Sequence, residues 1–452
     1  MPSASWRAPT LRDLFVLAWP VVVGRAAQSV VGFADAAMVA PLGPDALAAV
    51  GNGALNALAV MMLPMGVVTI VASYASQLHD SVDRARLRRY GWYGLGLAAA
   101  TELLGLVCLP LVAWLLGRAA YAPTVRALMT DYLVIRLVGA GAAVGLEALS
   151  HWFAGQGDTR LGLRANLLVM LLNVPLNAML IRGAWGFTPM GVRGAALASV
   201  IATAAGFGYA LWRFVGAGRG VAACGWRWAE VQRMLRFGLP NGVNWFLEFG
   251  AFLFFVDVVF AGMGTAALAA LMAVLQLNTV AFMPAFGLSS AGAIHVGQAI
   301  GDDAKDAVPA LVWRAAAVAC AWMGLVGVGY ALAPRWLLVP FAPVESVARA
   351  EFLAVAVPLL WVAVGWQLFD ATAMALGEAL RAAGDTAWPM RARIVLAWGF
   401  FVPATLLAAR AGAGPTLTLG LVVLYMGALA AMLVWRFRGG AWRTMALTAE
   451  ET

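Results

Sequence analysis

Residues 46–72 read ALAAVGNGALNALAVMMLPMGVVTIVA, and none of these 27 side chains carries a charge. The hydrocarbon core of a bilayer accommodates about 20 apolar residues in helical conformation, so this stretch predicts a helix that crosses a membrane. The same pattern recurs along the chain. We expect twelve such spans, at roughly 14–40, 46–72, 93–116, 128–153, 162–182, 192–215, 235–261, 267–293, 310–333, 351–380, 391–411 and 414–437.

The composition supports a membrane protein over its whole length. Of 452 residues, 63% are hydrophobic and 12% are charged, whereas a soluble domain is about half apolar and a quarter charged. A soluble core cannot hide so much apolar surface, so the lipid bilayer must solvate it. The net charge of +8 comes from arginines scattered through short loops, which gives no indication of nucleic-acid binding.

The positive charges indicate the orientation, because cytoplasmic loops of membrane proteins are enriched in Lys and Arg. With the N-terminus inside, 21 of the 30 Lys and Arg residues fall in cytoplasmic segments and seven in outside loops. Arg391 and Arg393 are counted with the cytoplasmic ones, and Arg25 and Arg136 fall inside spans. We therefore expect a multi-pass protein of the bacterial inner membrane with both termini in the cytoplasm.

The chain contains an internal repeat of about 220 residues. Five residues of the first half recur in the same order in the second half, with offsets of 220, 221, 220, 221 and 227 residues. The pairs are Pro20 and Pro240, Gly43 and Gly264, Pro64 and Pro284, Gln77 and Gln298, and Asp158 and Asp385. We expect an N-terminal lobe of helices 1–6 at 1–215, a cytoplasmic linker at 216–234 and a C-terminal lobe of helices 7–12 at 235–452.

Each half has an even number of spans, so both halves enter the membrane from the same side. This predicts an all-α fold of two homologous six-helix lobes, related by a pseudo-two-fold axis along the membrane normal. A duplication of this kind builds a central cleft, which is the geometry of an alternating-access transporter.

Ionisable side chains inside spans are costly, and each is a functional hypothesis. The clearest cases are acidic: Asp35, Glu248, Asp257 and Asp370. Such a carboxylate can bind a proton, Na⁺ or an organic cation, and competition between these ligands for one site is the basis of antiport. We take Asp257 as a structural or vestibule residue. The less central ionisable groups within spans are Glu102, Glu147, His151, Arg25 and Arg136.

Polar and aromatic neighbours extend these candidates. Asn173 and Asn177 are spaced i, i+4 and share a helix face, although span asparagines also bond neighbouring helices structurally. Asp35 itself could instead have a structural role, tied locally to Gln28 or to another helix. Trp366, four residues before Asp370, is a candidate aromatic contact for a cationic substrate.

Enzymatic signatures are weak. The sequence has no HExxH, no P-loop and no paired cysteines, and its three histidines lack metal-ligand spacing. We therefore expect neither an enzyme nor a cofactor.

The motifs resemble those of the multidrug and toxic compound extrusion (MATE) family of cation antiporters. The resemblance covers essentially the whole chain and is carried by QSVVGFADAAMV at 28–39, AGQGDTR at 154–160, LRAAGDT at 380–386 and the Gln77 and Gln298 segments. It looks closest to the norfloxacin-pump branch. That branch has a Glu eight residues after the Pro of helix 7. It also has an Asp fifteen residues before the Asp of the second Gly-Asp motif.

Those two positions are Glu248 and Asp370 here, and the resemblance implies that they bind the coupling cation. If the protein is coupled to sodium, Glu248 and Asp370 would be the ligands of the Na⁺ ion. The resemblance likewise implies an N-lobe cation or proton site at Asp35, Asn173 and Asn177. Two departures from the family pattern are Arg25 in the first helix and Trp366, where some relatives have a Tyr.

We expect a monomeric antiporter that exports organic cations, driven by Na⁺ or H⁺. The alternative is a flippase for a lipid-linked precursor, whose pyrophosphate would require several deep Arg or Lys residues, and only Arg25 and Arg136 are deep. An intramembrane enzyme, the third alternative, lacks a nucleophile or metal constellation.

Overall fold

The fold is described from a computed structural model, which covers residues 8–80, 83–118, 122–217, 225–343, 345–445 and 447. Residues 218–224 of the expected linker lie outside this part. In chain order the helical elements are α1 (Leu11–Val39), η1 (Ala40–Leu42), α2 (Pro44–Val68), α3 (Ile70–Gln77), α4 (Arg84–Arg118), α5 (Pro123–Val138), α6 (Ala140–Gly155), α7 (Arg160–Arg182), η2 (Ala184–Gly186), α8 (Val192–Ala217), α9 (Trp228–Phe254), η3 (Phe255–Phe260), η4 (Ala261–Met263), α10 (Thr265–Gly301), η5 (Lys305–Ala307), α11 (Val308–Leu332), α12 (Pro334–Leu338), η6 (Val339–Phe341), α13 (Ser346–Ala383), α14 (Ala387–Ile394), η7 (Val395–Phe401), α15 (Val402–Arg410), α16 (Pro415–Arg438) and η8 (Ala441–Thr444).

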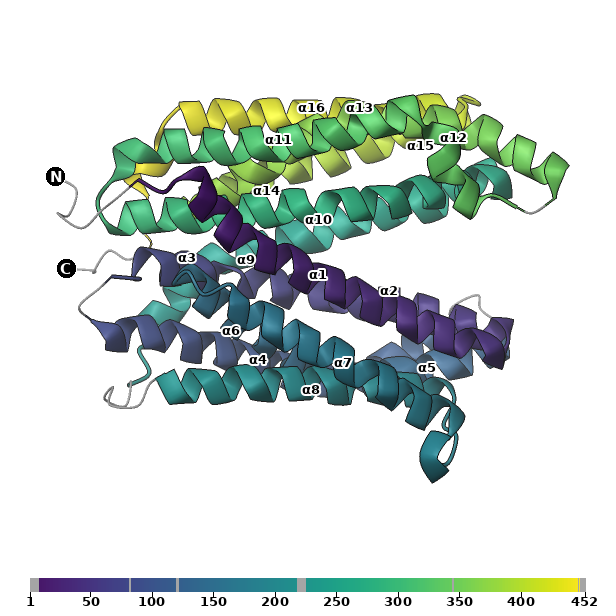
Figure 1. The fold of residues 1–452 in the computed structure, drawn as a ribbon, viewed down its shortest axis with the longest axis horizontal. Helices are drawn as coiled ribbons and strands as arrows, with labels where there is room; N and C mark the ends of the chain where they lie inside the picture. The colour runs from purple at the N-terminus through teal and green to yellow at the C-terminus, as the bar shows by residue number, and fades with distance from the viewer. Residues whose placement is uncertain are drawn as a thin grey trace. The chain divides into compact units, whose positions relative to one another are not determined.

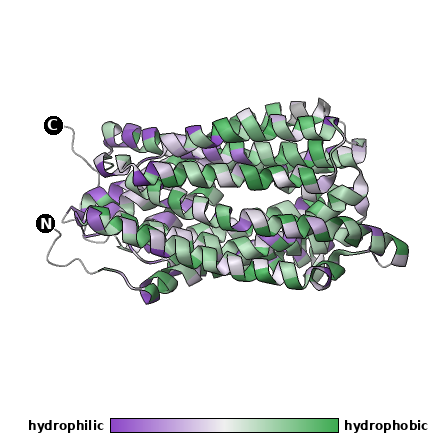
Figure 2. Cartoon of the chain, turned by 90° about the horizontal axis from the view of Figure 1, so that it is seen from above, coloured by the Kyte–Doolittle hydropathy of each residue, from purple (hydrophilic) through white to green (hydrophobic). Residues whose placement is uncertain are grey.

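The spans agree with the all-α prediction. Within the described residues, eleven helices are long and apolar enough to cross a membrane, and the pair α5 and α6, bent by 45°, can form a twelfth span. Figure 2 shows hydrophobic residues along the helices and a concentration of hydrophilic residues at their left-hand ends. This distribution is expected where lipid surrounds the helices and water meets their ends.

A glycine and a carboxylate shape the bent span. α5 ends and α6 begins at Gly139, where a Cβ would come within 2.8 Å of the Val200 side chain. The buried start of α6 is stabilised by Glu102 of α4, whose Oε2 accepts a hydrogen bond of 2.6 Å from the backbone N–H of Gly141. A carboxylate at a helix N-terminus also interacts favourably with the helix dipole. Glu102 therefore has a structural partner.

The chain forms two compact units. One, here the N-unit, is Pro20–Gly242, and the other, the C-unit, is Met1–Trp19 with Val243–Thr452. The division falls within α1 and α9, next to the equivalent Pro20 and Pro240, rather than in the segment at 216–234. The start of each helix therefore belongs to one unit and the remainder to the other.

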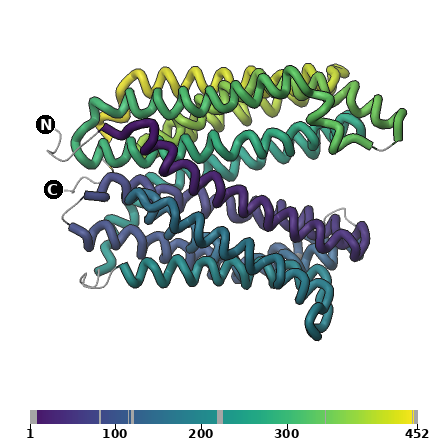
Figure 3. Tube along the Cα trace, in the orientation of Figure 1, coloured from purple at the N-terminus to yellow at the C-terminus, as the bar shows by residue number. Residues whose placement is uncertain are grey.

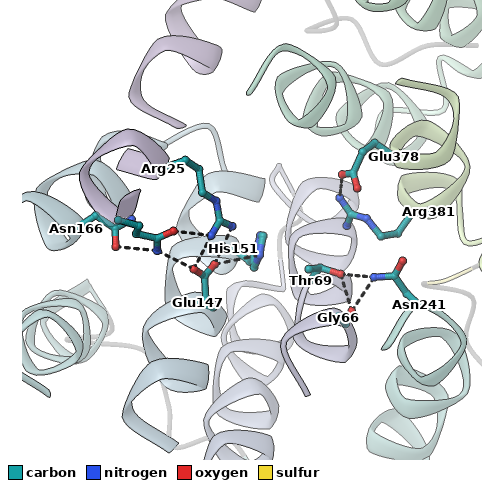
Figure 4. A network of polar contacts seen from close by, with 10 residues as sticks. Arg25, Gly66, Thr69, Glu147, His151, Asn166, Asn241, Glu378 and Arg381 are labelled. Carbon is teal, nitrogen blue, oxygen red and sulfur yellow. Dashed lines mark hydrogen bonds and ion pairs between the residues drawn. The ribbon is translucent and has the colours of Figure 1, made fainter. Parts of the chain in front are cut away.

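Hydrogen bonds hold the start of α1 in the C-unit and the start of α9 in the N-unit. In the C-unit, Arg314 donates a hydrogen bond to the carbonyl of Pro9, just before α1. In the N-unit, Glu230 of α9 accepts two hydrogen bonds from Arg89, of 2.8 and 2.9 Å. Asn241 donates to the Gly66 carbonyl over 2.7 Å and to Thr69 Oγ1 over 2.8 Å, as Figure 4 shows.

The duplication is visible in the backbone. Gly43 and Gly264 each follow a 3₁₀ turn and have φ of +112° and +103°. Gly157 and Gly384, in the two Gly-Asp motifs, have φ of +93° and +95°. Only glycine adopts such angles at little cost. These two pairs of repeated glycines therefore form the same turns in both halves of the chain.

In the C-unit, α13 packs against α10, α11 and α16, which run side by side in Figure 1. Figure 3 traces these helices lengthwise through the unit. In the N-unit, α7 packs on α8, α4 on α6 and α2 on α5. Small residues permit the close approach: a Cβ at Gly194 would lie 2.4 Å from the Leu180 carbonyl oxygen.

The chain ends of the C-unit meet at one end of it. Arg443 of η8 donates to Asp306 over 2.8 Å, and Lys305 donates to the Arg443 carbonyl over 3.0 Å. The first turns of α11 also lie beside the start of α1, through Arg314 and Pro9. The first and last described segments thus lie at the same end, as an even number of crossings requires.

Candidate functional site

In the N-unit, Asp35 of α1 lies in a buried polar cluster with α7 and α8. Its Oδ1 accepts hydrogen bonds from Asn173 over 3.1 Å and from Asn177 over 2.6 Å, and its Oδ2 accepts one from Ser199 over 2.7 Å. Asp35 is 6% exposed, and both asparagines are fully buried. The structure thus brings together the three residues expected from the sequence; we call them, with Ser199, the N-unit acidic site.

Local sequence explains this convergence. Asn173 and Asn177 lie one turn apart on α7, and the Asn177 amide donates to Asn173 Oδ1 over 3.0 Å. Pro175 lies between them inside the helix. The close contact of α8 with α7 brings Ser199 within 3.2 Å of the Asn173 amide nitrogen. Ser199 was missed from the sequence because a small polar residue in an apolar helix has the pattern of ordinary packing.

The N-unit acidic site has the chemistry of a cation site. Asn177 Oδ1 is buried and accepts no hydrogen bond from any described residue, although buried polar atoms are almost always partnered. Carboxylate and amide oxygens together are typical ligands of hard cations.

A second polar network lies elsewhere in the N-unit (Figure 4). Arg25 of α1 binds Glu147 of α6 through two hydrogen bonds of 2.9 and 3.2 Å. His151, one turn later on α6, lies 3.6 Å from the same carboxylate. Gln28 of α1 donates to Glu147 and to Asn166 of α7, each over 3.2 Å. Arg25 is thus paired with a carboxylate, and Gln28 contacts this network.

In the C-unit, the two expected carboxylates share a guanidinium. Glu248 of α9 forms an ion pair with Arg393 of α14. Asp370 of α13 interacts electrostatically with both of these groups, and Tyr425 of α16 belongs to the same electrostatic cluster. We call Glu248, Asp370 and Arg393 the C-unit acidic site.

The sequence analysis counted Arg393 among the cytoplasmic positive charges, and the structure shows that its side chain pairs with Glu248 of α9. Arg393 lies within a span, with 18% of its side chain exposed. The detectable signal was its place inside an apolar window, eight residues after Asp385. Loop and span arginines cannot be separated there by composition alone, because a long side chain can extend in either direction along the helix.

Trp366 is 5% exposed and packs among aliphatic and aromatic side chains of the C-unit core. Asp257 lies in the π-helical segment η3. No group of three or more His, Cys, Asp or Glu side chains suited to a metal ion occurs among the described residues.

The comparisons with known proteins agree with this architecture. The MatE family pattern matches residues 20–179 and 243–407, which is most of the chain. A Probable multidrug resistance protein NorM of Chromobacterium violaceum is 31% identical over 404 residues, covering 86% of this chain and 83% of that protein. The Multidrug resistance protein NorM of Burkholderia vietnamiensis is 27% identical over 431 residues, covering 94% and 93%.

Among solved structures, a MOP superfamily transporter from Pyrococcus furiosus superposes with a TM-score of 0.83 and 19% identity, covering 96% of both chains. At this identity the likeness establishes the fold. The family match establishes more, because it spans both halves of the chain, and it indicates a transporter rather than an enzyme. This chain belongs to the MatE family of membrane transporters.

Proposed function

We propose that this chain exports organic cations from the cytoplasm across the bacterial inner membrane, in exchange for inward movement of H⁺ or Na⁺. It works by alternating access, as a monomer with both termini in the cytoplasm. Relatives named multidrug resistance protein support the export of small, chemically varied substrates.

One observation supports this function above the others: the fully buried pair of asparagines around Asp35, with Asn177 Oδ1 left without a partner among the described residues. A buried carboxylate with a spare amide oxygen offers oxygen ligands and negative charge to a cation or proton. Coupling is energetically feasible, since a membrane potential supplies about 2.3 kcal/mol per charge per 100 mV.

The acidic site of the C-unit is the second coupling group in this proposal. Two carboxyl groups, those of Asp370 and Glu248, face the single guanidinium of Arg393. A flippase for a lipid pyrophosphate would instead need unpaired arginines. Here Arg25 is bound to Glu147 and Arg393 to Glu248, whereas the buried Nε of Arg136 has no hydrogen-bond partner among the described residues. One such arginine does not supply the several that a pyrophosphate requires, so the observations favour cationic substrates.

The test is ethidium uptake into everted membrane vesicles, with pH and Na⁺ gradients imposed separately. We expect one gradient to drive uptake, and Asp370→Asn to remove the response to that gradient. The surface carboxylate Asp131, paired with Arg193 over 2.9 Å, provides a control, because Asp131→Asn should leave uptake unchanged. Uptake by the Asp370→Asn protein with an undiminished ion response would contradict a coupling role for this residue.

A further inference from the structure

The position of Arg393 is unusual for an arginine near the end of a span. It lies eight residues after the Gly-Asp motif that precedes α14. Such side chains commonly extend toward the aqueous interface. Arg393 instead pairs with Glu248 of α9, which lies 145 residues away in sequence.

The internal repeat shows that this contact is built into the fold. Glu248 and Gln28 are separated by 220 residues, and Arg393 and Asn166 by 227, the offsets of the Pro20 and Asp158 pairs. In the N-unit, Gln28 and Asn166 are joined by a hydrogen bond of 3.2 Å. The same two positions therefore meet in both units, once as a neutral amide pair and once as an ion pair.

We propose that Arg393 is a built-in counter-ion of the C-unit acidic site, which therefore takes up one exchangeable proton and does not use Na⁺. This inference rests on the proposed function and names the coupling ion at one of its sites. The titratable and charged groups around Arg393 are Glu248 from α9, Asp370 from α13 and Tyr425 from α16.

The charge balance leads to this assignment. Two carboxylates and one guanidinium leave one negative charge, which a single proton neutralises. Because Glu248 holds the guanidinium, Asp370 is the group that exchanges the proton: it binds one from outside and releases it to the cytoplasm. Taken by itself, the guanidinium would weaken the binding of a Na⁺ ion about 4 Å away by roughly a thousandfold, and the paired Glu248 carboxylate offsets part of this repulsion.

The first experiment measures binding of ²²Na⁺ to the purified full-length protein at fixed pH. We expect Arg393→Gln to bind one more Na⁺ than the wild type, and Arg393→Gln combined with Asp370→Asn to lose that gain. Arg393→Lys keeps the positive charge and should behave like the wild type. Arg391→Gln removes an exposed arginine from the same helix and should also change nothing.

The second experiment measures ethidium uptake into everted vesicles. Wild-type uptake should collapse with a protonophore and ignore a Na⁺ gradient, whereas Arg393→Gln should respond to Na⁺ and show an altered pH profile. If Arg393→Gln is poorly folded, Glu248→Gln with Arg393→Gln removes both charges of the pair and leaves neither unpaired. This protein should respond to Na⁺, and adding Asp370→Asn should abolish the response.

The outcomes separate the two proposals. A Na⁺-driven wild type, or Arg393→Gln with no added Na⁺ binding and an unchanged pH profile, would overturn the role of Arg393. Absence of ethidium transport in every vesicle would instead count against the proposed function, while the ²²Na⁺ measurement would still decide whether Arg393 excludes sodium.

Discussion

Replacing Asp35 by Asn removes the charge of the N-unit acidic site and nearly preserves its shape. The carboxylate accepts three hydrogen bonds, from Asn173, Asn177 and Ser199. In the variant, the amide oxygen can keep both asparagine donors. The new amide nitrogen can donate to Ser199, whose hydroxyl rotates to accept. All three contacts can therefore survive the substitution.

The expected effect on stability is small. Hydrogen bonds to a charged group contribute about 1.5–3 kcal/mol and neutral ones about 1 kcal/mol, so conversion of three bonds costs a few kcal/mol. Removing a buried charge relieves a desolvation penalty that is also several kcal/mol. These effects oppose each other, and we expect the thermal unfolding midpoint to move by only a few degrees.

The expected effect on transport is large. A cation about 4 Å from an ionised carboxylate gains about 4 kcal/mol at an effective dielectric constant of about 20, which corresponds to roughly a thousandfold in affinity. A neutral Asn also cannot carry a proton. Ethidium uptake into everted vesicles, normalised to the amount of inserted protein, should therefore fall to the level of empty vesicles.

The decisive comparison sets transport against folding in the same preparation. Uptake at the wild-type rate by a well-inserted Asp35→Asn protein would refute the reasoning and make Asp35 a structural residue. A protein that fails to insert would show that the compensating hydrogen bonds described above do not form. Asp131 is a partly exposed carboxylate of the same unit. The Asp131→Asn protein should match the wild type in both measurements.

Two further predictions concern topology and the bent span. With both termini in the cytoplasm, a single cysteine placed at Arg84 in a cysteine-free background should resist membrane-impermeant thiol reagents in intact cells; rapid labelling would reverse the orientation. Glu102→Leu should leave the Gly141 N–H without its acceptor and lower stability by about 1–3 kcal/mol, seen as a lower unfolding midpoint. Glu102→Gln retains an acceptor oxygen, so its stability should fall much less. Equal losses of stability in both variants would exclude the hydrogen bond as the cause.

The candidate site was partly predictable because its members carry local signals. Asp35 and Asp370 stand out as acids in apolar spans, and the i, i+4 spacing of Asn173 and Asn177 indicates one helix face. The partners of these groups have no local signal. Asn177 lies 142 residues from Asp35, and Arg393 lies 145 from Glu248, so no periodicity connects them.

The sequence alone determined the class of protein, the membrane spans and the duplication. These follow from local properties, because a helix in lipid satisfies its own backbone hydrogen bonds and needs only a long enough apolar stretch. The repeated turns at Gly43 and Gly264 are likewise local, since they depend on a conformation that glycine permits.

Only the tertiary structure decided how the buried charges are balanced. Composition shows an excess of deep acids, but it does not show that Arg393 turns inward to Glu248, that Glu147 neutralises Arg25, or that Glu102 caps a broken helix. Each of these depends on which helices pack together and which way a long side chain extends. Electrostatic energy varies steeply with these distances in a medium of low dielectric constant, so the three-dimensional arrangement sets the chemistry of the site.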